Sequence, residues 1–161
     1  MLHKLVFSCL IVFLLGTAFA QPSTNNKLIA YKTISSGGAP MLNENGQSVN
    51  STNTTYFVYL STNSTVQPNI QCIYINQKAY RFKLEKVTSL PIIRVQNNGK
   101  KVLVKNTKQK VWQLLIVDEI ATNTQESTSE NVFKNELVVS FRSKKEMVVK
   151  QLEELDPTVY E

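Results

Sequence analysis

The chain has 161 residues and a net charge of +6, from 18 basic and 12 acidic side chains, and 42% of its residues are hydrophobic. This length is enough for one hydrophobic core of ordinary size, so one domain is expected. The only histidine in the sequence, His3, lies in an N-terminal leader. The mature chain therefore lacks the imidazole that Ser-His-Asp catalysis, Cys-His catalysis and histidine-ligated metal sites all require.

Residues 1–20 have the three parts of a secretory signal peptide. Lys4 supplies the positive n-region, Leu5 to Gly16 is almost wholly apolar, and Ala18-Phe19-Ala20 is a small-x-small cleavage site. The apolar part is shorter than the roughly 20 residues that cross a bilayer as a helix, so no transmembrane segment is predicted in the mature chain. We expect a secreted or periplasmic protein, cleaved after Ala20. Residues 21–161 then form a single domain with 17 basic and 12 acidic residues.

The mature chain keeps one cysteine, Cys72, which excludes an internal disulfide despite the oxidising destination. Its place in a β-like run favours a small buried apolar residue over a reactive thiol. The stability of the domain must then come from packing.

Regular structure is first expected at Lys27 to Ile34, which is rich in strand-forming residues. Ser35 to Thr54 contains glycine, proline and many asparagines, and it predicts a long loop with a short edge segment at Pro40 to Leu42. Thr55 to Ser61 returns to strand-forming residues and predicts the second strand.

A tight hairpin is predicted for Asn69 to Asn76 and Lys78 to Lys86, because only about two residues, Asn76-Gln77, separate the arms. The second arm alternates in the manner of a half-buried antiparallel strand. One face carries Tyr80, Phe82 and Leu84, and the other carries Arg81, Lys83 and Glu85.

A second hairpin is predicted for Ile92 to Gln96 and Lys101 to Lys105. The intervening Asn97-Asn98-Gly99 tolerates the positive φ angles of primed hairpin turns, and it is the strongest turn signal in the chain. Lysines along the second arm are typical of a sheet edge, where they discourage pairing with another molecule.

The longest apolar run of the mature chain is Val111 to Val117, and it predicts the central strand. Seven residues suit a strand better than a helix, which usually needs ten or more. One face carries Val111, Gln113, Leu115 and Val117 and the other carries Trp112, Leu114 and Ile116, so both faces require cover.

Thr122 to Asn131 is rich in Ser, Thr, Asn and Glu and predicts a solvated loop. Leu137 to Arg142 and Glu146 to Leu152 predict a last hairpin around Ser143-Lys144-Lys145. Residues 146–155 also fit a helix with an apolar face, and the strand is preferred because two adjacent valines follow a hairpin-length turn.

These elements amount to eight or nine short strands at roughly ten-residue spacing, with no convincing amphipathic helix. The pattern predicts an all-β protein, an antiparallel β-sandwich of immunoglobulin-like architecture. The immunoglobulin cysteine pair is absent, so the prediction concerns architecture and not ancestry.

The strongest functional signal is a basic stretch from Lys78 to Lys110, which holds ten basic residues and one acid, Glu85. Cationic side chains interleaved with aromatic ones can hold a polyanion, which outside the cytoplasm suggests an acidic glycan, a lipid surface or a cell-wall polymer more than nucleic acid. The alternative is that these lysines only keep the protein soluble and guard sheet edges. The candidate binding surface consists of Tyr80, Arg81, Lys83, Lys100, Lys101 and Lys105.

No catalytic, cofactor or metal site is predicted. The one glycine pair lacks the ending of a phosphate-binding loop, and two aspartates 38 residues apart cannot build a calcium loop. Glycosidase chemistry needs two acids several ångströms apart, but the adjacent Asp118 and Glu119 would point to opposite faces of a strand. Glu153, Glu154 and Asp156 lie near the C-terminal end.

The sequence therefore favours a non-catalytic binding or accessory module of the cell envelope, with a protein or an acidic polymer as partner and no cofactor. One alternative is a secreted enzyme inhibitor that presents Ser35 to Thr54 or Thr122 to Asn131. The other alternative is a carboxylate-dependent glycan hydrolase. Asn50, Asn53 and Asn63 begin N-glycosylation triplets, which would be silent in the bacterial envelope that the leader and chain suggest.

Overall fold

The computed structural model describes residues 26–36, 41–42, 45, 48–49, 52–120 and 129–156. Most of this part of the chain is in β-strands, so the predicted all-β class is confirmed. It contains a single short helix, α1 (Glu130–Lys134). The strands are β1 (Lys27–Ser36), β2 (Met41–Leu42), β3 (Ser48–Val49), β4 (Thr52–Thr62), β5 (Ile70–Ile75), β6 (Lys78–Lys86), β7 (Ile92–Gln96), β8 (Gly99–Val104), β9 (Lys110–Glu119), β10 (Leu137–Phe141), β11 (Glu146–Val149) and β12 (Glu153–Leu155).

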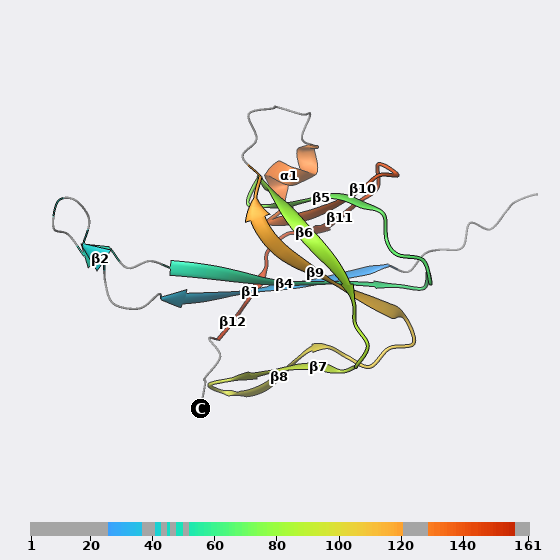
Figure 1. The fold of residues 1–161 in the computed structure, drawn as a ribbon, viewed down its shortest axis with the longest axis horizontal. Coiled ribbons are helices and arrows are strands. Elements are labelled where there is room, and N and C mark those ends of the chain that lie inside the picture. Colours follow the sequence, from blue (N-terminus) through green and yellow to red (C-terminus); the bar gives the residue numbers. More distant parts are fainter. Residues whose placement is uncertain are drawn as a thin grey trace, which may run out of the picture.

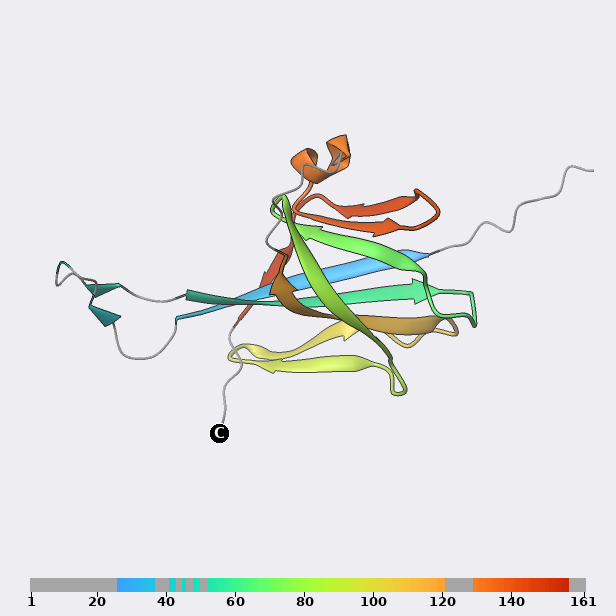
Figure 2. The same ribbon diagram turned by 45° about the horizontal axis from the view of Figure 1, so that its top comes forward.

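Eight of these strands form one mixed sheet in the order β11-β10-β5-β6-β9-β4-β1-β12. Every neighbouring pair is antiparallel except β1 and β12, which are parallel. The two edge strands, β11 and β12, are separated in sequence by only residues 150–152. The sheet must therefore curl until its two edges come together, and Figures 1 and 2 show this strong coiling.

The predicted central strand lies where expected, in the middle of the sheet as β9. It pairs with β4 on one side, where Leu114 lies opposite Val58, and with β6 on the other, where Leu114 lies opposite Leu84. Val111, Trp112 and Leu114 are all buried. Both faces of the strand are thus covered at its beginning, as the sequence predicted, whereas Val117 near its end is 52% exposed.

The three predicted hairpins are also present. Asn76 and Gln77 both have positive φ angles, 48° and 69°, which suits the two-residue turn between β5 and β6. Gly99 has a φ of 117° at the turn of the β7–β8 hairpin, where an L side chain would be strained. Residues 146–155 are extended in β11 and β12, which confirms the strand over the helix for this segment.

The sheet has buried hydrophobic residues on both faces, in two clusters. The inner cluster fills the concave side and consists of Ala30, Val58, Leu60, Ile73, Ile75, Leu114, Leu137, Val139 and Leu152. The outer cluster lies beneath the β7–β8 hairpin and consists of Tyr59, Leu103, Val104, Val111 and Leu155. The alternation of neighbouring residues such as Val58 and Tyr59 between the clusters follows from the two-residue period of a strand.

Glu136 bridges the place where the two edges of the sheet meet. Its backbone N–H donates to the carbonyl oxygen of Lys150 over 3.1 Å, and its Oε2 accepts from the N–H of Leu152 over 2.7 Å. Its Oε1 accepts from Nζ of Lys32 on β1 over 2.9 Å, in an ion pair whose side chains are 13% and 23% exposed. The Glu136 carboxylate thus connects β1 with Leu152, and its backbone N–H bonds Lys150, so one residue holds β1 and the segment between β11 and β12 together.

The immunoglobulin-like sandwich is not confirmed. Eight strands belong to one curled sheet, and the layer on its outer face is the two-stranded β7–β8 hairpin. The expected loop from Ser35 to Thr54 is shorter, because β1 continues to Ser36 and β4 begins at Thr52, with the small β2–β3 pair between them. The predicted signal peptide and most of the predicted loop from Thr122 to Asn131 lie outside the described residues. The described end of that loop belongs to α1.

Candidate functional site

The first half of the predicted basic surface lies on β6, and the strand divides it between two faces. Tyr80 packs toward the inner cluster and contacts Tyr56 edge to face, with 6.3 Å between ring centroids. Arg81 and Lys83 are exposed. Nη2 of Arg81 lies 3.1 Å from Oδ2 of Asp118 on β9. The structure therefore does not bring Tyr80 together with its two basic neighbours.

The second half of the predicted surface lies on β8 and directly after it. Lys101 forms an ion pair with Glu153 on β12, and the hydrogen bond to this carboxylate is the largest cause that raises the pKa of Lys101. At the turn of the hairpin, Nδ2 of Asn98 donates to Oδ2 of Asp156 over 3.0 Å. Lys100 and Lys105 are exposed. The β7–β8 hairpin is thus tied to the C-terminal strand, on elements different from those that hold Arg81 (Figure 1).

The inward side of the β7–β8 hairpin includes a cationic side chain, Arg94, which lies close to two aromatic rings. The guanidinium carbon of Arg94 lies 4.5 Å from the centroid of the Phe57 ring, a cation–π contact. Tyr59 is buried beside it, and burial raises the pKa of its phenol while the charge of Arg94 lowers it. Arg94 therefore packs the hairpin against β4, and its charge is not directed toward a ligand.

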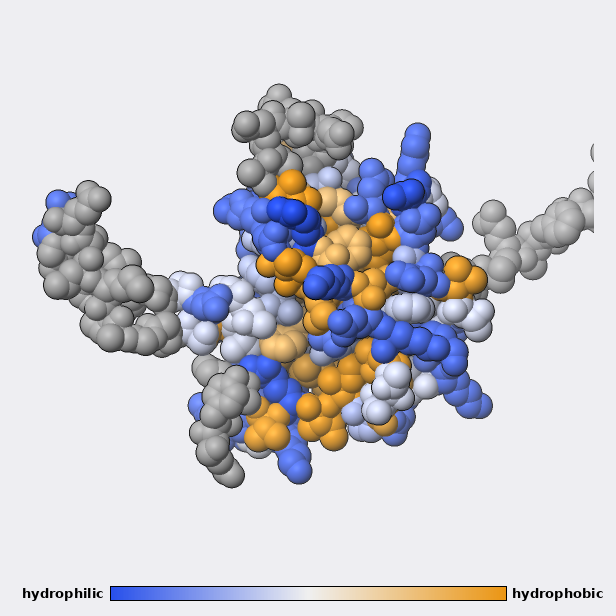
Figure 3. All heavy atoms as spheres, in the orientation of Figure 1, coloured by the Kyte–Doolittle hydropathy of each residue, from blue (hydrophilic) through white to orange (hydrophobic). Residues whose placement is uncertain are grey.

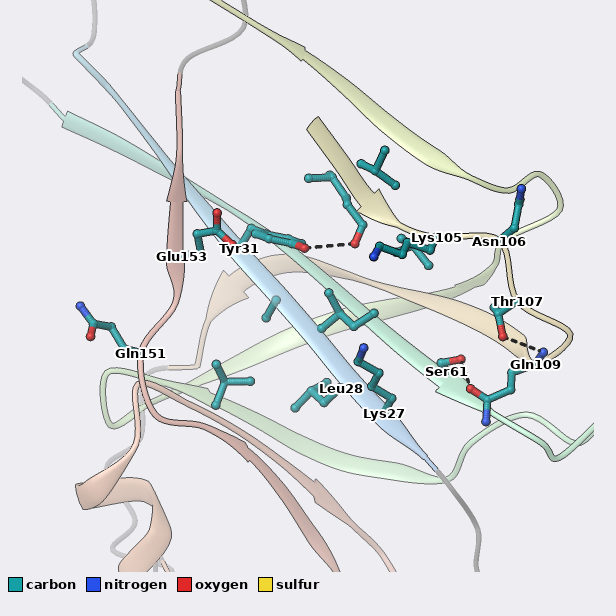
Figure 4. A pocket seen from close by; sticks show the side chains of 16 residues that line it. Lys27, Leu28, Tyr31, Ser61, Lys105, Asn106, Thr107, Gln109, Gln151 and Glu153 are labelled. Atoms are coloured by element: carbon teal, nitrogen blue, oxygen red, sulfur yellow. Dashed lines mark hydrogen bonds between the residues drawn. The ribbon is translucent and has the colours of Figure 1, made fainter. Parts of the chain in front are cut away.

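A groove of about 590 Å³ lies between β1 and the hairpin. The hydroxyl of Tyr31 on β1 donates to the carbonyl oxygen of Leu103 on β8 over 3.1 Å, so the two walls are joined at one point (Figure 4). Burial raises the pKa of Tyr31, and the charge of Glu153 raises it further. The phenol is therefore protonated, as a donor must be. The lining residues are Lys27, Leu28, Ile29, Ala30, Tyr31, Ser61, Val102, Leu103, Val104, Lys105, Asn106, Thr107, Gln109, Val149, Gln151 and Glu153.

Two lysines of this groove have no acidic partner among the described residues. The ion pairs found in that part of the chain use other cations, namely Lys32, Lys78, Arg81, Lys101 and Lys134. Lys27 extends from the start of β1 and Lys105 from the end of β8, as Figure 4 shows. The one carboxylate of the lining, Glu153, is already paired with Lys101. The groove consequently has two uncompensated positive charges.

The far end of the groove carries an ordered set of polar side chains. Oε1 of Gln109 accepts from the hydroxyl of Ser61 over 2.7 Å, and its Nε2 donates to Oδ1 of Asn63 over 3.0 Å. The backbone N–H of Gln109 donates to the hydroxyl of Thr107 over 3.1 Å. These bonds fix the orientation of Gln109, while Asn106 is exposed at the same rim.

Sequence reasoning identified Lys105 but missed Lys27 and the polar rim. Lys27 precedes Ile29 and Tyr31 at two-residue spacing, which puts all three on the outer face of β1, and this alternation was the available signal. Its approach to Lys105 depends on the hairpin folding back over β1, which no local pattern reveals.

A second hollow, of about 440 Å³, is lined by Asp118 and Glu119 together with Tyr56 and Tyr80. The two carboxylates are neighbours on β9. Asp118 pairs with Arg81, and Oε2 of Glu119 lies 2.9 Å from Nζ of Lys78. Each of the two carboxylates is therefore already paired with a basic side chain of β6.

Among the described residues, no group of three or more His, Cys, Asp or Glu side chains is placed to hold a metal ion. No helix in the same residues is long and apolar enough to cross a membrane. Comparison with protein-family models, with curated proteins and with solved structures found no match to this chain.

Proposed function

We propose that this chain is a non-catalytic, extracytoplasmic binding module that holds an acidic glycan in the groove between β1 and β8. The observation that carries the proposal is the pair of uncompensated lysines, Lys27 and Lys105, at a groove that also offers fixed amide and hydroxyl groups. Lysine is a compact, strongly hydrated cation that attracts carboxylate and sulfate groups.

The polar side chains at the far end of the groove favour a glycan as the ligand over a smaller anion. Sugar hydroxyls both donate and accept, and amide side chains such as Gln109 and Asn106 offer both functions. The floor of the groove includes apolar groups from Leu28, Ile29 and Val104, which match the C–H faces of a sugar ring. In this proposal the curled sheet and the β7–β8 hairpin are the scaffold that presents the groove.

The test compares two double variants that remove the same charge from residues 21–161. Lys27→Gln/Lys105→Gln acts on the groove, and the matched control Arg81→Gln/Lys83→Gln acts on β6. The ligands are a heparin oligosaccharide and oligogalacturonate, and neutral dextran reports binding that needs no charge. Calorimetry should show binding of the wild type to the two acidic glycans, with the affinity reduced about tenfold or more in the groove variant.

The control variant should keep affinity within about threefold, since Arg81 already pairs with Asp118. Binding should also weaken as salt rises, because screening shortens the Debye length to about 10 Å at 0.1 M. Equal losses in the two variants, or no binding to either acidic glycan, would refute the groove and leave the lysines a role in solubility.

A further inference from the structure

The β7–β8 hairpin is apolar on both of its faces. The inward face packs Ile92, Leu103 and Val104 onto the outer cluster. The opposite face exposes Ile93, Val95 and Val102, at 49%, 52% and 42% of their surface. A two-stranded ribbon that covers a core needs only one apolar face, so these exposed side chains have no role in the fold.

The exposed aliphatic side chains lie together. Ile93 is the cross-strand partner of Val102, and Val95 is the partner of Lys100 on the same ladder. Figure 3 shows hydrophobic residues gathered over β7 and β8 at the bottom of the view, with hydrophilic side chains around them. The hairpin also lies at one extremity of the molecule, away from β10 and β11 (Figures 1 and 2), so a flat surface can approach it.

The charged residues of the hairpin and of the segment that follows it are all basic. Residues 92–110 contain no acid and carry six basic residues. Two of these are used within the fold, since Arg94 lies over Phe57 and Lys101 pairs with Glu153. The other four are exposed, and they are Lys100, Lys105, Lys108 and Lys110. Asp156 is the acid that contacts the tip of the hairpin, at Asn98.

We infer that the β7–β8 hairpin docks on an anionic lipid surface. Its aliphatic side chains enter the boundary between headgroups and acyl chains, and the flexible lysines keep their amines among the anionic headgroups. A protein partner fits less well, because the centres of protein interfaces are depleted in lysine and enriched in aromatic residues. Lys100 lies directly beside Val95, and residues 92–105 contain no aromatic residue.

This inference goes beyond the glycan groove, and the two can be tested separately. Ile93 and Val95 are not part of the groove lining, and Lys27 is not part of the hairpin. A variant at Ile93 and Val95 should therefore lose lipid binding and keep heparin binding. Lys27→Gln should do the reverse.

The experiment is co-sedimentation of residues 21–161 with 100 nm vesicles of phosphatidylcholine, with or without phosphatidylglycerol at about 30 mol%. The wild type should bind the anionic vesicles and not the neutral ones. Ile93→Thr/Val95→Thr, which keeps β-branched side chains, should lower the partition constant about tenfold or more. The matched control Ile34→Thr/Val117→Thr makes the same chemical change at residues that are 38% and 52% exposed elsewhere, and it should bind as the wild type does.

Lys100→Gln provides a second variant that does not depend on the packing of the hairpin, because its side chain is exposed. It should bind anionic vesicles about fivefold more weakly. The inference is overturned if the wild type does not sediment with anionic vesicles, if it binds neutral ones equally well, or if Ile93→Thr/Val95→Thr binds as tightly as the wild type. Dimerisation through Ile93 and Val95 without vesicle binding, measured by sedimentation equilibrium, would overturn it in favour of a second copy of the chain.

Discussion

Replacing Glu136 should lower the free energy of unfolding, because its carboxylate bonds Lys32 and Leu152 where the two edges of the curled sheet meet, called the seam below. Glu136→Ala removes the acceptor of the Leu152 N–H and the partner of Lys32, two hydrogen bonds of 2.7 and 2.9 Å. Hydrogen bonds to charged groups contribute about 1.5–3 kcal/mol each. Lys32 is 23% exposed and regains some hydration, so the total loss should be about 2–4 kcal/mol.

Glu136→Gln separates the two contacts. The amide oxygen can still accept from Leu152, whereas the ion pair with Lys32 is lost, so the expected cost is smaller, about 1–2 kcal/mol. The matched control is Glu130→Gln on α1, which removes an exposed pair with Lys134 and should change stability by less than about 0.5 kcal/mol. Urea denaturation of residues 21–161, followed by Trp112 fluorescence, measures all three variants. A loss below about 1 kcal/mol for Glu136→Ala would show that the seam does not depend on this residue.

The same pair predicts a dependence on alkaline pH. The hydrogen bond to Glu136 raises the pKa of Lys32 above its ordinary value of 10.5. A raised pKa means that the folded state binds the proton more tightly than the unfolded state. The stabilisation is therefore complete below pH 10.5 and is lost as the pH rises through the raised value. Glu136→Gln should flatten this part of the profile.

Three further predictions concern the core, the buried phenol and the leader. Leu114→Ala should cost about 2–5 kcal/mol in urea denaturation, because Leu114 is 1% exposed between β4 and β6, and a loss below about 1 kcal/mol would mean that β9 is not central. Burial raises the pKa of Tyr59 above 10.0, so its contribution is complete below pH 10.0 and falls at higher pH. The wild type should lose more stability than Tyr59→Phe between pH 9.5 and 11.5, whereas parallel profiles would contradict the assignment. Intact mass of the exported protein should show a chain that begins at Gln21, and retention of residues 1–20 would disprove the predicted cleavage.

The strands and hairpins were predictable because their signals are local. Val111 to Val117 is apolar except for Gln113, and a run of this length predicts a strand with cover on both faces. The cover is complete only over the first half of the run, since Val117 is 52% exposed. Asn76-Gln77 and Asn97-Asn98-Gly99 lie between alternating segments at turn spacing, and a hairpin forms at each. The primed turn is confirmed at Asn76-Gln77, where both residues have positive φ angles, but not at the second hairpin, where only Gly99 has one and is already paired with Gln96. The alternation along β6 also predicted that Tyr80 and Arg81 lie on opposite faces of the strand. The candidate surface nevertheless included both residues, and the structure separates them.

The closure of the sheet and the groove could not be predicted, because they depend on contacts between distant segments. Residues 150–152 interrupt the last extended segment, so that β11 pairs with β10 and β12 pairs with β1. These three residues include no glycine or proline that would mark the interruption in the sequence. Nothing in the sequence distinguishes Glu136 from an ordinary solvated acid. The partners of its carboxylate, Lys32 and the N–H of Leu152, are more than 100 residues apart in the chain. Helix α1 was missed because five residues are too few to show a helical period.

The binding groove is tested most directly by nuclear magnetic resonance of ¹⁵N-labelled residues 21–161 during titration with a heparin tetrasaccharide. Contact in the groove predicts chemical-shift changes concentrated in residues 27–31 and 102–109, with the side-chain amides of Asn106 and Gln109 among them. In Lys27→Gln/Lys105→Gln the same changes should need about tenfold or more ligand to reach half of their full size. Shifts centred on Arg81 and Lys83, or spread evenly over all exposed lysines, would contradict a defined glycan groove between β1 and β8.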